Sequence, residues 1–198
     1  MIGYVIGGGA GVGKSTVARA LASELDAGWL QLDSIWLALL VSAEPGSQRA
    51  RILDVPAAVR SGRRDGAALL EQHIAAAALV EQVLPAVFAL EGSVHERLVV
   101  DGAWLTPGGV ARLAGEGIEL RTAYLLESDA TGVQAALDRR AGPGRSPRPS
   151  DAVHAQLAHD YGQWLAAQAL ERGMPVLPAR PYATAVSRIL AALGGLSG

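Results

Sequence analysis

The chain has 198 residues, half of them hydrophobic, and a formal net charge of -2. This length fits one domain with an ample core, and the charge excludes a broad basic surface of the kind that attracts nucleic acid. The sequence has no cysteine, which excludes disulfides and thiolate metal sites and makes a reducing cytoplasm the expected location.

Short apolar runs alternate with helical periods, as is typical of a parallel sheet covered by helices on both faces. The first run is too short for a signal peptide, and no run approaches the ~20 uninterrupted apolar residues that span a bilayer. The chain is therefore expected to form a single α/β domain over 1–198, with three layers and a five-stranded parallel sheet. The expected strands are Ile2–Ile6, Trp29–Leu32, Arg97–Val100, Leu120–Leu126 and Pro175–Leu177.

The segments between these strands are expected to be mainly helical. A helix is predicted from about Lys14 to Leu25, and the long strand-free segment at about 35–90 is predicted to form a helical flap on the acceptor side of the sheet. Thr106 followed by Pro107 is typical of a helix start. The segment 139–149, rich in proline and glycine, is predicted to be a short lid loop.

A glycine-rich loop follows the first predicted strand and opens the first predicted helix. It fits G-x-x-x-x-G-K-[ST], in which backbone N–H groups and the helix N-terminus surround phosphate oxygens. In this pattern Lys14 bridges the β- and γ-phosphates of ATP, and the Ser15 hydroxyl coordinates Mg²⁺. The residues predicted to bind nucleotide here are Gly8, Gly9, Ala10, Gly11, Val12, Gly13, Lys14, Ser15 and Thr16.

Lysine usage supports phosphate binding over a merely structural turn. Lys14 is the only lysine, against sixteen arginines, in a chain that also contains 24 glycines. A compact ammonium fits between two phosphates where a planar guanidinium does not. The lack of a second lysine also excludes the Asn-Lys-x-Asp motif of GTPases, and the Ser-Gly-Gly signature of ATP-binding-cassette proteins is missing.

Two aspartates follow apolar runs, and ligands of open α/β sheets bind beyond the carboxyl ends of the strands. Asp101, after Leu98-Val99-Val100, has the form of a Walker B element and is predicted to hold Mg²⁺ together with Ser15. Asp33 is predicted to face the acceptor and act as the base for its hydroxyl. The alternative for each is a helix N-cap, and the roles of base and metal ligand are open to exchange between them.

Arginines and tryptophans complete the predicted site. Arg139 and Arg145 are predicted to close over the transferring phosphoryl group as catalytic residues of the lid, with a solvated arginine-rich loop as the alternative. Five arginines lie in the flap, and an acceptor that carries phosphate or carboxylate is one of two open interpretations of them. The predicted acceptor-binding residues are Asp33, Trp36, Trp104, Arg63 and Arg64. The four histidines lack metal-ligand spacing, and no role is predicted for them.

With these motifs in place, the sequence resembles the P-loop small-molecule kinases, the group that includes nucleoside-monophosphate, shikimate and gluconate kinases. It is most similar to 2-phosphoglycerate kinases, through the segment 98–107 and the ending 175–190. The resemblance implies ATP and Mg²⁺ as cofactors, with adenine near Arg139 and near Arg180 and Pro181. Those kinases usually carry glutamate where Asp101 stands and histidine where Trp104 stands, so the acceptor-contacting positions differ.

The predicted function is therefore transfer of the ATP γ-phosphoryl group to a hydroxyl or phosphate of a small molecule. Three alternatives are a nucleotide-dependent regulatory ATPase or switch, an antibiotic-inactivating phosphotransferase on the same scaffold, and a nucleic-acid end kinase. The net negative charge disfavours the last of these, and neither nucleic acid nor a membrane is an expected partner.

Overall fold

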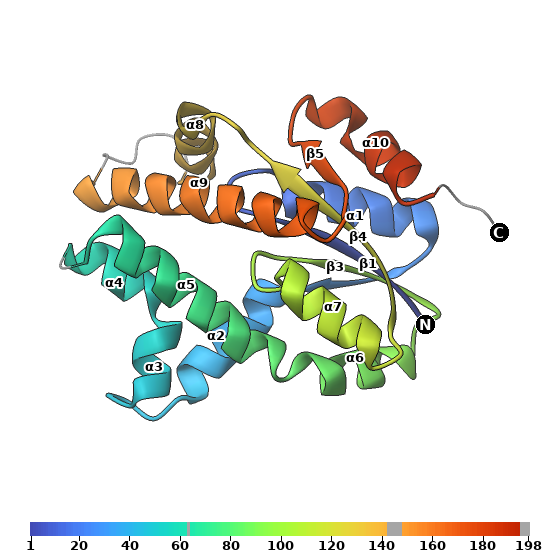
Figure 1. Cartoon of the computed structure of the whole chain (residues 1–198), viewed down its shortest axis with the longest axis horizontal. Helices are drawn as coiled ribbons and strands as arrows, with labels where there is room; N and C mark the ends of the chain where they lie inside the picture. The colour runs from blue at the N-terminus through green and yellow to red at the C-terminus, as the bar shows by residue number, and fades with distance from the viewer. Residues whose placement is uncertain (63, 142–147, 195–198) are drawn as a thin grey trace.

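The computed structural model describes residues 1–62, 64–141 and 148–194 (Figure 1). A five-stranded sheet forms its centre, with strand order β2-β3-β1-β4-β5 and every pairing parallel. The strands are β1 (Ile2–Gly8), β2 (Gly28–Gln31), β3 (Arg97–Asp101), β4 (Glu119–Leu126) and β5 (Val176–Pro178). All five predicted strands are confirmed, and their ends shift by at most two residues.

The helices of the described residues lie between and after these strands. They are α1 (Lys14–Leu25), α2 (Leu32–Ser42), α3 (Gln48–Leu53), α4 (Val55–Ser61), α5 (Gly66–Glu81), α6 (Leu84–Gly92), α7 (Pro107–Gly115), α8 (Ala130–Ala141), α9 (Pro149–Leu170) and α10 (Ala185–Ala192), with a 3-10 turn η1 at Tyr182–Thr184. The predicted start of α7 is confirmed, because the Thr106 hydroxyl accepts a hydrogen bond from the Gly109 N–H at 3.0 Å.

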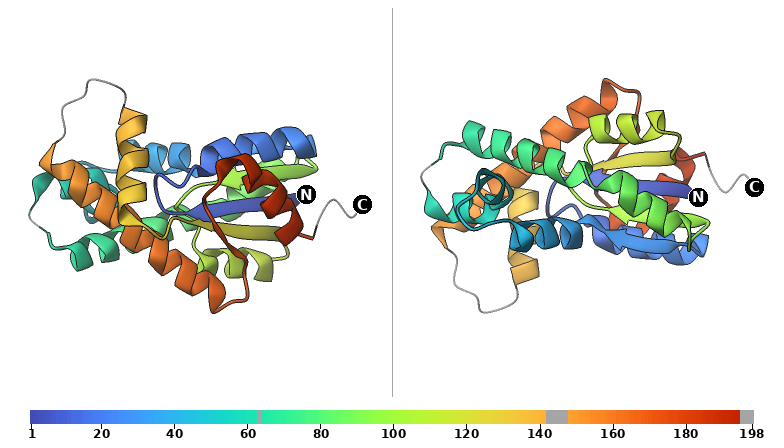
Figure 2. Two further views of the ribbon diagram at one scale, coloured as in Figure 1. Left: turned by 90° about the horizontal axis from the view of Figure 1, so that it is seen from above. Right: turned by 90° about the horizontal axis from the view of Figure 1, so that it is seen from below.

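Helices cover both faces of the sheet (Figures 1 and 2). On one face α1 and α10 pack against Tyr4, Ile6 and Val99, and on the other face α5, α6 and α7 pack against the alternate residues Val5 and Val100. This alternation follows from the two-residue period of a strand, whose successive side chains point to opposite faces. The predicted three-layer α/β fold is confirmed.

The flap is the helical segment α2 to α5, which extends beyond the sheet at the left of Figure 1. Its helices hold together through buried residues such as Leu53, Val59 and Leu69, which join the core cluster on the α5 side of the sheet. The helix α6 returns to the sheet, where Phe88 is buried beside β3. The segment predicted at about 35–90 therefore divides into an extending part and one helix that belongs to the main core.

No single helix of the described residues has the length and apolar composition needed to cross a bilayer. Only α5 and α6 taken together pass that test, and they are bent by 43° at their junction.

Candidate functional site

The loop between β1 and α1 needs glycine for both conformation and space. Gly13 has φ +85°, in the left-handed region that favours glycine, and it directly precedes α1. A Cβ on Gly13 would lie 2.8 Å from Cε1 of Tyr182, and a Cβ on Gly9 would lie 2.4 Å from the Ala158 carbonyl oxygen. The loop therefore fits closely between α9 and η1, and it directs the N-terminus of α1 into the site.

Replacing Gly13 by Ala is expected to weaken nucleotide binding by roughly tenfold or more. The left-handed conformation costs a non-glycine residue about 1–2 kcal/mol, and the added methyl group would also displace the Tyr182 ring. Isothermal titration with the Mg²⁺ complex of ADP measures the change. Gly46→Ala is the matched control, because Gly46 has φ +77° but nothing lies within 4 Å of the position that its methyl group would take. Equal losses in the two variants would contradict the assigned role of the loop.

Lys14 is buried, with 9% of its surface exposed, and its Nζ donates a hydrogen bond to the Gly9 carbonyl oxygen at 2.7 Å. Burial lowers the pKa of this ammonium, while the negative charges of Asp33 and Asp101 act in the opposite direction. The Gly9 carbonyl therefore holds the Lys14 side chain against the loop, where two carboxylates act on its charge.

Asp101 is the last residue of β3 and is almost fully buried. Its Oδ2 accepts a hydrogen bond from the Ser15 hydroxyl at 2.6 Å, and its Oδ1 accepts one from the Trp29 indole N–H at 2.7 Å. Residues far apart in the sequence thus bring a carboxylate and a hydroxyl together at the head of α1. These oxygen atoms fit Mg²⁺, which is usually held by one or two protein groups plus substrate phosphates. The described residues contain no group of three or more His, Asp or Glu side chains that could hold a metal.

Asp33 does not end a strand as predicted. The strand β2 stops at Gln31, and Asp33 lies in the first turn of α2. Its Oδ1 accepts a hydrogen bond from the Trp104 indole N–H at 2.7 Å, and its side chain lines the cleft. Neither Asp33 nor Asp101 serves as an N-cap, since Gln31 precedes α2 and Thr106 caps α7. The capping alternative is therefore wrong for both aspartates.

One cleft of about 1200 Å³ joins the loop to the flap. Of the residues predicted for the site, it brings together at its wall Ala10, Gly11, Gly13, Lys14, Ser15, Thr16, Asp33, Trp36, Trp104 and Arg139. Asp101 is reached through its hydrogen bond with Ser15. The sequence therefore places the phosphate loop, both aspartates and two predicted acceptor-binding tryptophans around a single space.

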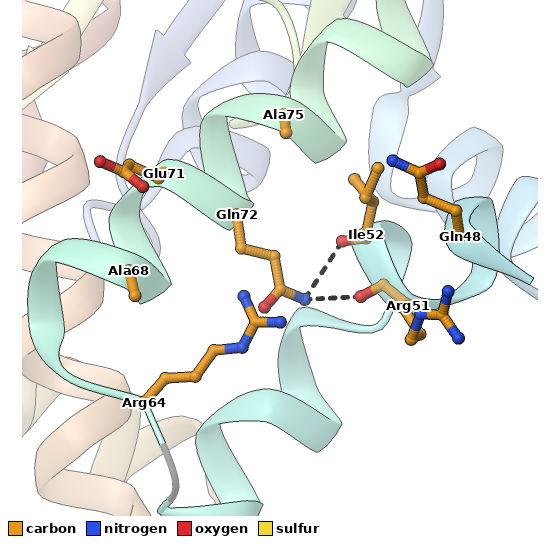
Figure 3. Close-up of a pocket in the computed structure, with 8 residues that line it drawn as sticks. All are labelled: Gln48, Arg51, Ile52, Arg64, Ala68, Glu71, Gln72 and Ala75. Carbon is orange, nitrogen blue, oxygen red and sulfur yellow. Dashed lines mark hydrogen bonds between the residues drawn. The ribbon is translucent and has the colours of Figure 1, made fainter. Parts of the chain in front are cut away.

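Four predicted arginines have different surroundings. Arg63 and Arg145 lie outside the described residues. Arg64 lines a separate hollow of about 490 Å³ between α3 and α5, with Gln72 beside it (Figure 3). Arg180 is held by Glu127, whose Oε2 accepts a hydrogen bond from its Nε at 2.6 Å, and it does not line the cleft. Instead Tyr182, two residues after Arg180 and one after Pro181, lines the cleft next to the loop.

An aromatic stack forms the wall between flap and core, and sequence reasoning missed its central residue. His73 of α5 lies between Trp104 and Tyr161, with ring centroids 4.8 Å and 4.0 Å away, and it lines the cleft. Trp36 stacks on Trp104 at 5.0 Å, and Trp164 stacks on Tyr161 at 5.6 Å. His73 shares a helical face with the buried Leu69, Ala76 and Val80, and this spacing was the available signal.

Both ring nitrogens of His73 are buried and have no hydrogen-bond partner among the described residues. Burial lowers the pKa of His73 to about 3, and positive charge on His154 and Lys14 acts in the same direction. The imidazole is therefore neutral over the physiological range, with one nitrogen as donor and the other as acceptor.

The buried neutral state of His73 predicts sensitivity to acid. An unfolded histidine binds a proton near pH 6.5, whereas the folded one does not until about pH 3, so the free energy of unfolding falls as pH drops through this window. Urea titrations between pH 7 and pH 4 are expected to show a smaller acid-induced loss for His73→Phe than for the parent, because Phe keeps the stack but cannot bind a proton. Identical pH dependence would show that His73 titrates freely in the folded protein.

Comparison with known proteins agrees with this architecture. No protein-family model matches the sequence, and no curated protein matches it. Among solved structures the chain is similar to "Crystal Structure of a gluconokinase from Sinorhizobium meliloti 1021", with a TM-score of 0.53 and 17% identity, over 97% of this chain and 91% of that chain. The chain has the α/β fold of that structure, with a five-stranded parallel sheet flanked by helices. The similarity to 2-phosphoglycerate kinases stays a prediction.

Proposed function

We propose that the protein is an ATP-dependent kinase that transfers the γ-phosphoryl group to a hydroxyl of a small molecule. The observation that carries this proposal is the meeting of Lys14, the Ser15–Asp101 pair and Asp33 around one cleft. A nucleotide-binding site alone would need the loop and the metal ligands. The additional carboxylate, which is partly exposed and opens onto the same cleft, provides a base for an acceptor.

In this proposal each group has one task. Backbone N–H groups of the loop and the N-terminus of α1 bind the phosphate chain, and Lys14 neutralises its terminal part. Mg²⁺ bound by Ser15 and Asp101 would supply charge stabilisation to the phosphates. Asp33 orients the acceptor hydroxyl with Oδ2 while Oδ1 is fixed by Trp104. It takes the hydroxyl proton as the acceptor oxygen bonds to the γ-phosphorus, and the bond from that phosphorus to ADP breaks.

The arginines of the cleft fit the same scheme. Arg139 and Arg140 end α8, Arg148 precedes α9, and all three are exposed residues at the wall of the cleft. Positive charge on Arg140 reaches Lys14, as its effect on the pKa of that ammonium indicates. Arginines in this position stabilise charge on the transferring group and help to exclude water. Arg139 therefore keeps its proposed catalytic and nucleotide-binding roles.

Acceptor dependence tests the proposal directly. The purified protein with Mg²⁺ and ATP is expected to release little ADP alone and to release it at least tenfold faster with a suitable alcohol, because closure on the acceptor excludes water. A regulatory ATPase would hydrolyse ATP equally fast without any acceptor. Absence of nucleotide binding, measured by calorimetry, would disprove both functions.

A further inference from the structure

The acceptor side of the cleft is mainly apolar. Beyond Asp33, its wall consists of apolar residues of α2, α4 and α9. They are Trp36, Leu37, Val55, Pro56, Val59 and Leu157. Ligand sites of this composition bind molecules that bury apolar surface and make a small number of specific polar contacts. The flap therefore presents a surface suited to an acceptor with a sizeable apolar part.

Two of the described flap arginines lie away from this surface. Arg51 and Arg64 line the separate hollow between α3 and α5 (Figure 3), and the Arg51 guanidinium donates a hydrogen bond to the Gly46 carbonyl oxygen. Among the described flap arginines only Arg60 lines the cleft, and it is an exposed residue. Interactions of exposed charges are weak because water and salt screen them.

Among the described residues, an anionic acceptor would therefore find only exposed arginines on this side of the cleft. A carboxylate or phosphate that left water here would meet apolar side chains and the negative charge of Asp33. Removing an ion from water is costly unless it is paired and hydrogen-bonded. Of the arginines of α8 and the start of α9 that line the cleft, Arg140 acts on the charge of Lys14, where the nucleotide phosphates would bind, and Arg139 and Arg148 are exposed residues.

His73 contributes no positive charge to the same wall. Its ring stacks between Trp104 and Tyr161, and both ring nitrogens are buried, so a ligand does not reach them while the stack keeps this arrangement. Its pKa of about 3 keeps it neutral, so it offers no positive charge to an anion at neutral pH.

Building on the proposed function, we propose that the acceptor is an uncharged alcohol with a sizeable apolar part. Its reacting hydroxyl lies at Asp33, and its apolar part contacts Trp36, Val55 and Val59. On this basis the acceptor is neither a phosphorylated nor a carboxylated small molecule, and the described flap arginines are interpreted as exposed side chains.

Matched pairs of probes that differ by one charged group test this acceptor class. Phenyl β-glucoside is compared with phenyl β-glucuronide, and each of four nucleosides with its 5′-monophosphate, by titration into the protein that is saturated with Mg²⁺ and a non-hydrolysable ATP analogue. The uncharged member is expected to bind at least about tenfold more tightly in each pair that binds. Equal or tighter binding of the charged members, or binding by no uncharged probe, would overturn the inference. Nucleotide binding itself would still support the proposed function in either case, whereas its loss would disprove that function.

Two variants test the wall itself, using the uncharged probe that binds best. Leu37→Ser removes apolar surface from the wall at a half-exposed position, so the probe is expected to bind at least about threefold more weakly while nucleotide affinity and the thermal midpoint are not lowered. Arg51→Met removes a flap charge that lies outside the cleft and is expected to leave probe binding unchanged. Unchanged affinity in Leu37→Ser, or a loss in Arg51→Met, would contradict the assignment.

Discussion

Replacing Lys14 by Met is expected to lower turnover by about 10²–10³-fold or more. Lys14 is the only lysine of the chain and the buried cation at the mouth of the phosphate loop. Met has a similar length and flexibility but carries no charge, so the loop keeps its packing while the terminal phosphate loses its partner. Acceptor-dependent ADP release at saturating ATP measures the loss.

Lys14→Arg separates the effect of charge from that of shape. A guanidinium keeps the positive charge, but it is too wide for the space that the Gly9 carbonyl and the two aspartates leave for an ammonium. This variant is expected to lose nearly as much activity as Lys14→Met. Parental turnover in the Met variant would remove the loop from the mechanism, and full rescue by Arg would show that charge alone is sufficient.

Asp33→Asn is expected to lower kcat by about 10²–10⁴-fold, with nucleotide affinity unchanged. An amide oxygen still accepts the hydrogen bond from the Trp104 indole, so the side chain keeps its position in the cleft. The amide cannot take up the hydroxyl proton, however, and the attacking oxygen loses its base. Single-turnover measurements isolate this step from product release.

Two further substitutions serve as comparisons for Asp33→Asn. Asp65, in the same flap, is the N-cap of α5, and its carboxylate accepts a hydrogen bond from the Ala68 N–H. Because Asn is an equally good N-cap, Asp65→Asn is expected to leave kcat unchanged. Asp101→Asn is expected to raise the Mg²⁺ concentration needed for half-maximal rate, whereas Asp33→Asn should leave that concentration alone. The opposite pattern would exchange the roles of the two aspartates.

The sheet and the phosphate loop follow from local sequence signals. Buried strands of a parallel sheet appear as short apolar runs, and α1 has both a clear apolar stripe and the glycine-rich loop before it. The loop and Asp101 could be predicted together because each lies next to a strand, and strand order brings β1 and β3 side by side. Asp33 was assigned to a strand end because Leu32 continues the apolar run, whereas Leu32 is the buried first residue of α2.

Side-chain direction in the flap could not be predicted in the same way. Its arginines were grouped by sequence, but Arg60 on α4 lines the cleft, whereas Arg64, in the connection between α4 and α5, lines the separate hollow. Arg180 follows β5 beside a phosphate-binding loop, yet Glu127 at the end of β4 holds it. Contacts between segments that are distant in the sequence determine where these arginine side chains lie, and no local sequence pattern predicts them.

The stacked rings give the acceptor wall a property that a flexible flap would lack. Trp36 of α2, His73 of α5, Trp104 of the segment after β3 and Tyr161 of α9 interlock, and Tyr161 also donates a hydrogen bond to the Ala103 carbonyl oxygen at 2.7 Å. The wall is therefore already formed before a ligand binds, so binding loses little conformational entropy in ordering these side chains. In the proposed kinase, selectivity would then arise mainly by steric exclusion, and accepting larger alcohols would require replacing one of these rings by a smaller side chain.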